Sequence, residues 1–343
     1  AWLLGVAPIW NSELAAFLRG DENSIPERLT MLEPWVPGKI PVVFVHGTAS
    51  SSGRWAGLYN ELRNDPLLGD QYQFWFFAYN SGNPIAFSAA KLRQALASAV
   101  ERLDPARHDP TLRQMVLVGH SQGGLLVRLV ISDSTVVDYE ALGVRFPDEK
   151  NLRAEDIATL REVLFFRPSP NVARVIFLAT PHQGSFVAGG ILGEIGSGLV
   201  SVSQRLLSVP WRVVVVPAGK VAKGESPLAR EPLDVRTAVD NMAPDSRFVR
   251  LLHELPMNSR VPKHSIVGVR GVGHVEDGND GVVEYKSAHL DEAVSEAVVR
   301  SSHSLQSNPS TVGEVKRILR EHAEALALGR AAPRSGVEPS SPY

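Results

Sequence analysis

The residues that could carry chemistry centre on one serine. Gly119-His120-Ser121-Gln122-Gly123 matches the pattern G-x-S-x-G and lies between a short apolar run, 115–118, and an apolar segment with helical spacing, 125–131. A serine at a sharp strand-to-helix turn has a strained backbone, and glycines two residues away on each side remove side chains that would collide there. The turn exposes the hydroxyl and leaves the Gln122 amide at a helix N-terminus, where an anionic oxygen is stabilised. We therefore interpret Ser121 as a nucleophile. A phosphate-binding glycine loop is the alternative, but neither a further glycine motif nor an acidic motif of a nucleotide-binding site supports it.

An earlier loop can supply the second backbone donor that acyl transfer needs. His46-Gly47-Thr48 directly follows the apolar run 40–45. Thr48 stands where the loop after a neighbouring strand would place an N–H group against a substrate carbonyl. The amides of Thr48 and Gln122 are therefore the predicted oxyanion donors. His46 precedes the nucleophile in the chain, and we interpret its ring, like that of His120, as a loop-forming group and not as a base.

The acid that would orient a base is expected after the nucleophile. For a serine on this kind of turn, the chain order of a triad is serine, acid, histidine. Two Asp-Gly pairs compete for the acid, Asp277-Gly278 and Asp280-Gly281. We favour Asp280 because an apolar pair, Val282-Val283, follows it and can pack onto a sheet while the carboxylate stays in the loop. Both carboxylates also fit a simple turn, which Asp-Gly forms routinely.

Three histidines follow the acid and are candidates for the base. His289 is only nine residues beyond Asp280, which leaves little room for a further element between acid and base. His322 falls within a helical pattern, and we expect it to face solvent. His303 follows the candidate last strand, 293–299, and precedes the final helix. His303 is therefore the predicted base, and a surface histidine in a serine-rich loop is the alternative.

Short apolar runs alternate with helical patterns along the chain. This alternation predicts βαβ units and a mostly parallel sheet with helices on both faces. Runs that are apolar on both alternate positions are typical of buried parallel strands. The expected strands are 40–45, 72–79, 115–118, 175–178, 265–269 and 293–299, and the main expected helices are 55–62, 85–103, 125–131 and 312–328.

The length of 343 residues fits one large α/β domain with insertions. We expect a wrapping segment over 1–39, a domain over 40–328, and a flexible tail over 329–343, which is rich in Pro, Ser, Gly and Arg. Segments 133–170 and 184–262 are too long for simple connections and are predicted to be insertions. The second is large enough for a cap, and its apolar stretch 186–209 fits either a lid or ordinary packing.

Composition excludes several kinds of chemistry. The formal net charge is −2, from 35 Lys plus Arg and 37 Asp plus Glu, and no long basic run suggests a nucleic-acid partner. The chain has no cysteine, which removes disulfides, thiolate metal sites and thiol nucleophiles. No stretch has the length and the continuous apolar composition of a transmembrane helix.

Taken together, these motifs resemble the α/β-hydrolase fold, and within it the bacterial serine lipases and esterases. The resemblance covers about 40–328: His46-Gly47 resembles their oxyanion loop, 119–123 their nucleophile elbow, and 279–283 their acid loop. Thr180-Pro181-His182-Gln183-Gly184-Ser185 is also similar to a segment of lipid-remodelling deacylases.

The resemblance implies two-step acyl transfer by Ser121, Asp280 and His303, with no cofactor and no metal. The implied substrate is a small-molecule or lipid ester with an apolar acyl chain, and peripheral contact with a lipid surface fits such a substrate. Acyltransferase, amidase or lipid deacylase activity on the same fold, or a non-catalytic binding module, are the alternatives. The resemblance is also compatible with an exported protein.

Overall fold

A computed structural model describes residues 27–137, 153–186, 238–244 and 246–331. Within these ranges the chain forms a seven-stranded sheet in the order β1-β3-β2-β4-β5-β6-β7. β1 pairs antiparallel with β3, and the other neighbours are parallel. The strands are β1 (Arg28–Met31), β2 (Ile40–Val45), β3 (Tyr72–Ala78), β4 (Met115–His120), β5 (Val172–Leu178), β6 (Lys263–Gly268) and β7 (Ser295–Val299).

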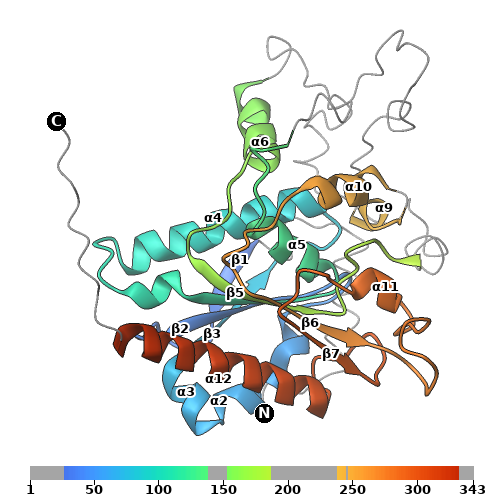
Figure 1. Cartoon of the computed structure of the whole chain (residues 1–343). Coiled ribbons are helices and arrows are strands. Elements are labelled where there is room, and N and C mark those ends of the chain that lie inside the picture. The colour runs from blue at the N-terminus through green and yellow to red at the C-terminus, as the bar shows by residue number, and fades with distance from the viewer. Residues whose placement is uncertain (1–26, 138–152, 187–237, 245, 332–343) are drawn as a thin grey trace.

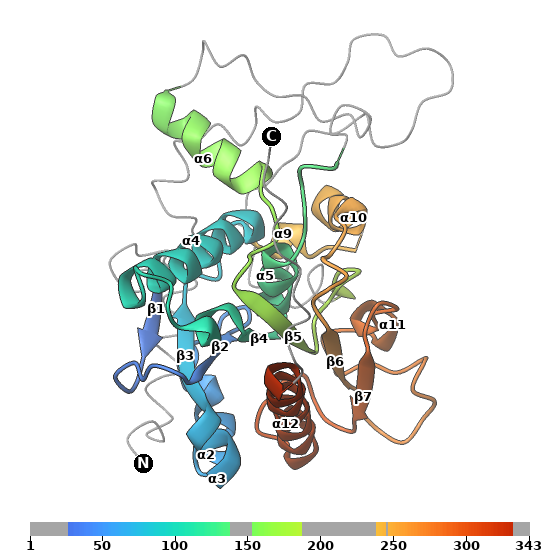
Figure 2. The same ribbon diagram turned by 60° about the vertical axis from the view of Figure 1, so that its left-hand side comes forward.

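Helices cover both faces of this sheet (Figures 1 and 2). α4, α5, α6 and α10 lie on one side, whereas α2, α3 and α12 lie on the other. The helices are η2 (Ser52–Trp55), α2 (Ala56–Arg63), α3 (Pro66–Gln71), α4 (Ile85–Leu103), η3 (Pro110–Arg113), α5 (Gln122–Val130), α6 (Ala154–Leu164), α9 (Ala238–Asn241), α10 (Arg247–Glu254), α11 (Tyr285–Ala288) and α12 (Pro309–Ala331).

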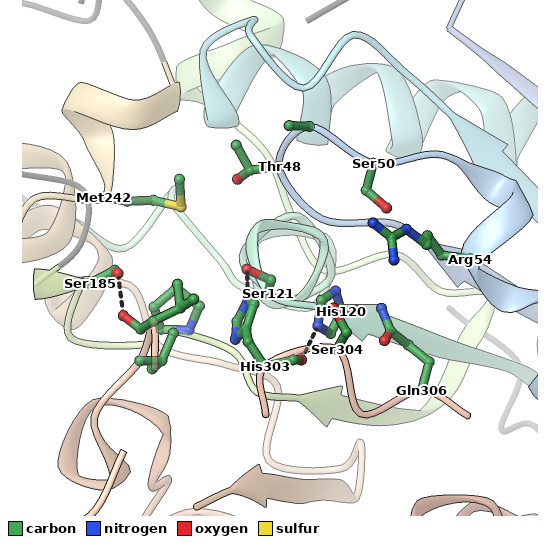
Figure 3. A pocket seen from close by; sticks show the side chains of 14 residues that line it. Thr48, Ser50, Arg54, His120, Ser121, Ser185, Met242, His303, Ser304 and Gln306 are labelled. Carbon is green, nitrogen blue, oxygen red and sulfur yellow. Dashed lines mark hydrogen bonds between the residues drawn. The ribbon is translucent and has the colours of Figure 1, made fainter. Parts of the chain in front are cut away.

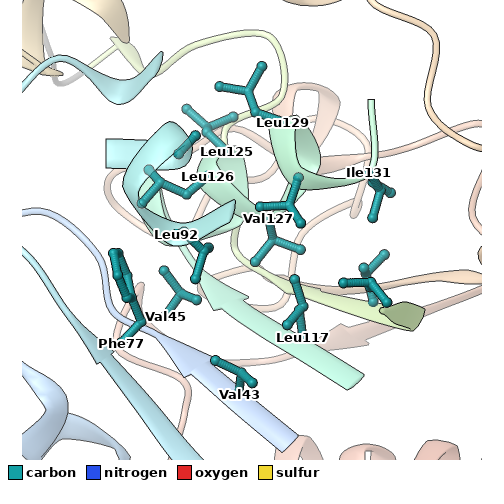
Figure 4. Packing of buried hydrophobic residues seen from close by; sticks show 14 of the residues in the cluster. Val43, Val45, Phe77, Leu92, Leu117, Leu125, Leu126, Val127, Leu129 and Ile131 are labelled. Atoms are coloured by element: carbon teal, nitrogen blue, oxygen red, sulfur yellow. The ribbon is translucent and has the colours of Figure 1, made fainter. Parts of the chain in front are cut away.

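Side-chain alternation along the central strands explains why they are apolar throughout. In β4, Met115 and Leu117 pack into the cluster under α4 and α5, whereas Val116 and Val118 pack into the cluster under α2 and α12. Successive side chains of a strand point to opposite faces, so a strand covered on both faces needs an apolar residue at every position. Figure 4 shows the first cluster, where Leu117 lies below the buried helix α5. The parallel, doubly covered sheet predicted from the sequence is confirmed.

The segment before β2 contains a strand that the sequence analysis did not predict. β1 pairs with β3 from Arg28↔Ala78 to Met31↔Trp75 and forms one edge of the sheet. This edge strand is only half-buried, so it lacks the continuous apolar run that revealed the central strands. At the other end of the chain, α12 extends to Ala331, three residues into the segment expected to be a tail.

The expectation that His322 faces solvent is wrong. Its side chain is 4% exposed because α12 packs that face onto the sheet. The Nε2–H of His322 donates to the Gln114 carbonyl (3.1 Å), and its Nδ1 accepts from Nε of Arg174 (3.3 Å). Arg174 also donates from Nη1 to Nε2 of His264 (2.6 Å). The Gln114 carbonyl, just before β4, and Arg174 of β5 thus give both ring nitrogens a partner, which allows this histidine to be buried.

Candidate active site

The serine turn joins β4 directly to α5 at the carboxyl end of the sheet. Ser121 has φ 53° and ψ −125°, a conformation that L side chains rarely adopt, and its N–H donates to the Leu178 carbonyl of β5 (2.9 Å). Gly119 is required by its surroundings because an added Cβ would lie 2.6 Å from Cα of Gly124. A Cβ on Gly123 would meet the carbonyl oxygens of Val45 and His46. The glycines of the motif therefore allow the end of β4, the start of α5 and the end of β2 to approach closely.

Gly124 is a further glycine of this turn that the sequence analysis did not use. A Cβ at this position would collide with the Thr180 side chain, which follows β5. The second glycine of the pair at 123–124 was the available sequence signal. It indicates close packing of the first helical turn against two neighbouring strands.

The three residues predicted as nucleophile, acid and base lie in one hydrogen-bonded chain. Nδ1 of His303 lies 2.7 Å from Oδ2 of Asp280, and Nε2 of His303 lies 2.9 Å from Oγ of Ser121. A carboxylate can only accept, so Nδ1 carries the proton, and Nε2 of the neutral ring accepts from the serine hydroxyl. The loops after β4, β6 and β7 supply these residues, because the carboxyl ends of the parallel strands lie at the same edge.

The carboxylate of Asp280 is buried and held by backbone donors. The side chain is 1% exposed, and Oδ1 accepts from the N–H groups of Val282 and Val283, both at 2.8 Å. The backbone carbonyl of Asp280 also accepts from the N–H of His303 (3.1 Å). The Val-Val pair therefore does more than anchor the loop, since its amides hold the carboxylate toward the imidazole.

The alternative candidates for the acid and the base, Asp277 and His289, lie away from the serine. Asp277 is exposed and 3.8 Å from Nζ of Lys286. His289 contacts Glu296 through Nδ1 (2.7 Å) and Asp291 through Nε2 (3.1 Å), and the hydrogen bond to Glu296 raises its pKa. Neither residue contacts Ser121 among the described interactions, so the geometry favours Asp280 and His303.

Side chains join the two loops that carry the predicted oxyanion donors. Oγ1 of Thr48 donates to Oε1 of Gln122 (2.6 Å), and Nε2 of Gln122 donates to the Ser81 carbonyl (3.1 Å). The N–H of Ala49, a residue with φ 48°, donates to Oγ of Ser81 (3.0 Å). The first N–H groups of α5 have no acceptor within the helix. The arrangement holds the Thr48 loop next to this helix end, where Figure 3 places Thr48 across from Ser121.

Two buried histidines brace the site while remaining neutral. His46 stacks on Tyr79 with ring centroids 4.4 Å apart, and burial lowers its pKa to about 4. Burial, together with the nearby His303, holds the pKa of His120 well below its usual value. Nε2 of His120 donates to the His303 carbonyl (2.9 Å). The roles expected for both rings as loop-forming groups agree with these contacts.

A cavity of about 260 Å³ opens onto Ser121 and His303 (Figure 3). Its described lining has no aspartate, glutamate or lysine. The residues that line it are Thr48, Ala49, Ser50, Arg54, His120, Ser121, Pro181, Ser185, Met242, Val282, Val283, His303, Ser304 and Gln306. The apolar stretch expected as a lid, 186–209, lies outside the described residues apart from Phe186, which is exposed.

Among the residues that the structure describes, no group of three or more His, Asp or Glu side chains is arranged to hold a metal ion. No described helix combines the length and apolar character needed to cross a membrane.

Of three similar solved structures, the one with a TM-score above 0.5 supports the assignment of the fold. Lipase from Staphylococcus hyicus has a similar structure, with a TM-score of 0.52 and 15% identity, over 88% of this chain and 100% of that one. Lipase BlEst2 from Bacillus licheniformis in its mature form matches at a TM-score of 0.48 and 18% identity, over 85% and 97% of the two chains. Lipase 1 from Pelosinus fermentans matches at a TM-score of 0.49 and 14% identity, over 83% of this chain and 98% of that one.

No curated protein matches the sequence. The family model described as "Alpha/beta hydrolase family" matches residues 42–285, which is more than half of the chain and includes both the serine turn and the acid loop. The sheet order, the serine turn between β4 and α5, and this match agree with one another. The chain belongs to the alpha/beta hydrolase family.

Proposed function

We propose that the protein is a serine ester hydrolase that cleaves carboxylic esters of apolar acyl chains. The observation that carries this proposal is the hydrogen-bonded chain Asp280–His303–Ser121 at the wall of a cavity. A serine hydroxyl is a weak nucleophile unless an adjacent base accepts its proton. Nε2 of His303 is within hydrogen-bond distance for this transfer, and Asp280 orients the ring for it.

Acylation follows from this geometry. Oγ of Ser121 attacks the ester carbonyl carbon while its proton passes to Nε2 of His303. The negative charge on the carbonyl oxygen is stabilised by the backbone N–H groups of Thr48 and Gln122. The buried Asp280 carboxylate stabilises the imidazolium, which then donates its proton to the departing alcohol oxygen. The product of this half-reaction is an ester between Ser121 and the acyl group.

Deacylation repeats these steps with water as the nucleophile. His303 removes a proton from water, the oxygen attacks the acyl carbon, and the proton returns to Oγ of Ser121 as the carboxylic acid leaves. No residue of this cycle needs a cofactor or a metal. Pro181, Met242, Val282 and Val283 supply apolar surface for the acyl chain.

A serine-reactive fluorophosphonate probe tests the proposal. We expect the wild type to be labelled and Ser121→Ala to be unlabelled. Ser185→Ala is the matched control because Ser185 lines the same cavity, while its hydroxyl donates to the Val282 carbonyl (2.6 Å) and has no base beside it among the described contacts. Equal labelling of the wild type and Ser121→Ala would contradict the assignment.

Turnover of p-nitrophenyl esters from acetate to palmitate then tests the reaction itself. We expect kcat/KM to rise from acetate toward longer apolar chains, because their methylene groups leave water for the cavity. A protein that is labelled by the probe but hydrolyses no ester in the series would require a different acyl substrate.

A further inference from the structure

Gln306 is a buried residue of the cavity wall whose amide has no protein partner in the part of the chain that the structure describes. The residue is only 5% exposed, and it lines the cavity that opens onto Ser121. Among the described residues, none donates a hydrogen bond to its Oε1 or accepts one from its Nε2. Neither amide atom is sealed inside the protein, so both are accessible from the cavity. Almost all buried polar groups have a hydrogen-bond partner, so this exception requires an explanation.

The position of Gln306 in the cavity assigns it to one portion of the ester. In Figure 3, Met242 and Ser185 lie on one side of Ser121. Gln306 and Arg54 lie on the other side. Met242 belongs to the apolar surface assigned above to the acyl chain, so the end with Gln306 is left for the alcohol portion.

The turn that carries Gln306 is held close to the base. Leu305 is fully buried in the apolar cluster under α2 and α12, and its N–H donates to the His303 carbonyl (3.0 Å). Its own carbonyl accepts from the N–H of Asn308 (3.0 Å), and Oδ1 of Asn308 accepts from the N–H of Ser310 in α12 (2.9 Å). His303 protonates the departing alcohol oxygen. Gln306 therefore extends from a fixed turn three residues beyond the group that meets this oxygen.

The chemistry of a primary amide indicates what would pair with it. Nε2 of Gln306 has two N–H donors, and Oε1 is an acceptor. A hydroxyl group both donates and accepts, so it can pair with either atom, or bridge the two. An ether or carbonyl oxygen cannot donate to Oε1, and an alkyl group pairs with neither atom while it displaces water from both. Leaving such buried groups unpaired is unfavourable, so the site favours a hydroxyl over an alkyl group.

We propose that Gln306 binds a hydroxyl group on the alcohol portion of the ester and thereby selects esters of diols and polyols over esters of simple alkyl alcohols. The proposal rests on the ester hydrolysis proposed above. Gln306 contacts the substrate and takes no part in the proton transfers. Its effect therefore belongs to kcat/KM, which covers the steps up to departure of the alcohol.

Hydrolysis of three matched pairs of butyrate esters tests this specificity. The pairs are 2-hydroxyethyl and propyl, 3-hydroxypropyl and butyl, and 4-hydroxybutyl and pentyl butyrate. Within each pair a hydroxyl replaces a methyl group, and all six esters form the same acyl-enzyme. For at least one pair we expect the wild type to have a kcat/KM about tenfold higher for the hydroxyl ester, because the methyl ester leaves the amide unpaired. The pair with the largest ratio gives the distance from the ester to the hydroxyl.

Variants assign the preference to Gln306. We expect Gln306→Leu to reduce the hydroxyl-to-methyl ratio of kcat/KM about tenfold. Gln73→Leu is the matched control, because Gln73 is also buried but its amide is paired: Nε2 donates to the Lys39 carbonyl (2.8 Å), and Oε1 accepts from the N–H of Val36 (3.3 Å). We expect this control to keep the wild-type ratio. The ratio is measured within each protein, so it does not depend on the folded fraction. A wild-type ratio near one for all three pairs, or a ratio unchanged in Gln306→Leu, would overturn the proposal.

Urea unfolding of the same variants separates a binding role from a structural role. Gln73→Leu should lower the unfolding midpoint, because it leaves backbone groups at Val36 and Lys39 without their partner. Gln306→Leu should leave the midpoint at or above that of the wild type, because no described residue loses a hydrogen bond. A fall in the Gln306→Leu midpoint equal to that of Gln73→Leu would show a structural partner and overturn the proposal.

A binding measurement distinguishes failure of this proposal from failure of the proposed function. Calorimetry on Ser121→Ala compares the two esters of each pair without turnover. We expect the hydroxyl ester of at least one pair to bind about tenfold more tightly, and Gln306→Leu in the same background to remove the difference. Preferential binding without hydrolysis by the wild type would refute the proposed function and retain the hydroxyl site. Hydrolysis with no preference in either measurement would refute the hydroxyl site alone.

Discussion

Gly119→Ala tests whether the close approach of β4 and α5 positions the serine. The added Cβ would lie 2.6 Å from Cα of Gly124 and 2.7 Å from both the Gly123 carbonyl oxygen and the Gly124 nitrogen. All three are backbone atoms, so no side chain can rotate away. Ordinary contact begins at 3.4 Å. The start of α5 must therefore move by about 0.8 Å, and Ser121 lies within the segment that moves.

Two consequences follow from this displacement. A shift of about 1 Å in a reacting group costs roughly 10²-fold in rate, so kcat for p-nitrophenyl butyrate should fall by about that factor. Overpacking in a dense core costs about 1–3 kcal/mol, so the free energy of unfolding should fall by that amount. KM should change less than kcat, because the acyl-binding side chains belong to other loops.

Gly313→Ala is the matched control. Gly313 is exposed in α12, and a Cβ there would meet nothing within 4 Å. We expect this substitution to raise the free energy of unfolding by about 0.5–1 kcal/mol, because alanine is the better helix former, and to leave kcat unchanged. Ester hydrolysis assays and urea unfolding measure both quantities. A Gly119→Ala protein with near-wild-type kcat would refute the positional argument.

Three further predictions concern the acid, the base and the buried histidines. Asp280→Asn should lower kcat about 10⁴-fold, because the amide neither stabilises the imidazolium nor holds the neutral ring in the tautomer with its proton on Nδ1. A loss of kcat below tenfold in steady-state kinetics would contradict this. His303→Ala should cost a similar factor while His289→Ala costs little, and the reverse order in the same assay would exchange their roles. Burial beside Arg174 lowers the pKa of His264 and of His322 to about 4, so the unfolded chain takes up protons first as the pH falls. The free energy of unfolding should therefore decrease from about pH 6.5 toward pH 4, and His322→Gln should weaken this dependence in urea titrations at pH 7 and 5. An unchanged pH dependence of the free energy of unfolding in that variant would contradict the role given to His322 and would assign the dependence to other groups.

The nucleophile motif and the central strands could be predicted because their signals are local. The steric contacts that require Gly119 lie within a few residues of one turn, and the apolar runs follow from burial on both faces of the sheet. β1 was not predicted because an edge strand needs no continuous apolar run. The burial of His322 was mispredicted because its partners, Arg174 and Gln114, are remote in sequence.

The choice among the candidate acids and bases depended on distant contacts. Asp277 and Asp280 have the same local turn chemistry, and His289 and His303 differ only in spacing. The loops after β6 and β7 converge on the serine turn, and this convergence places the carboxylate and imidazole 2.7 Å apart. Arg54 gave no signal as part of any motif, and only the folded loops brought it into the cavity wall.

The sequence by itself therefore determined the class of fold, the serine at its turn and a short set of candidate partners. The tertiary structure decided which imidazole meets that serine, which carboxylate meets that imidazole, which histidine is buried and which charge lines the cavity. The physical reason is the range of the forces involved. Steric strain and side-chain alternation act over a few residues, whereas hydrogen-bond partners and cavity walls are set by segments far apart in the sequence, such as those of Ser121 and His303, which are 182 residues apart.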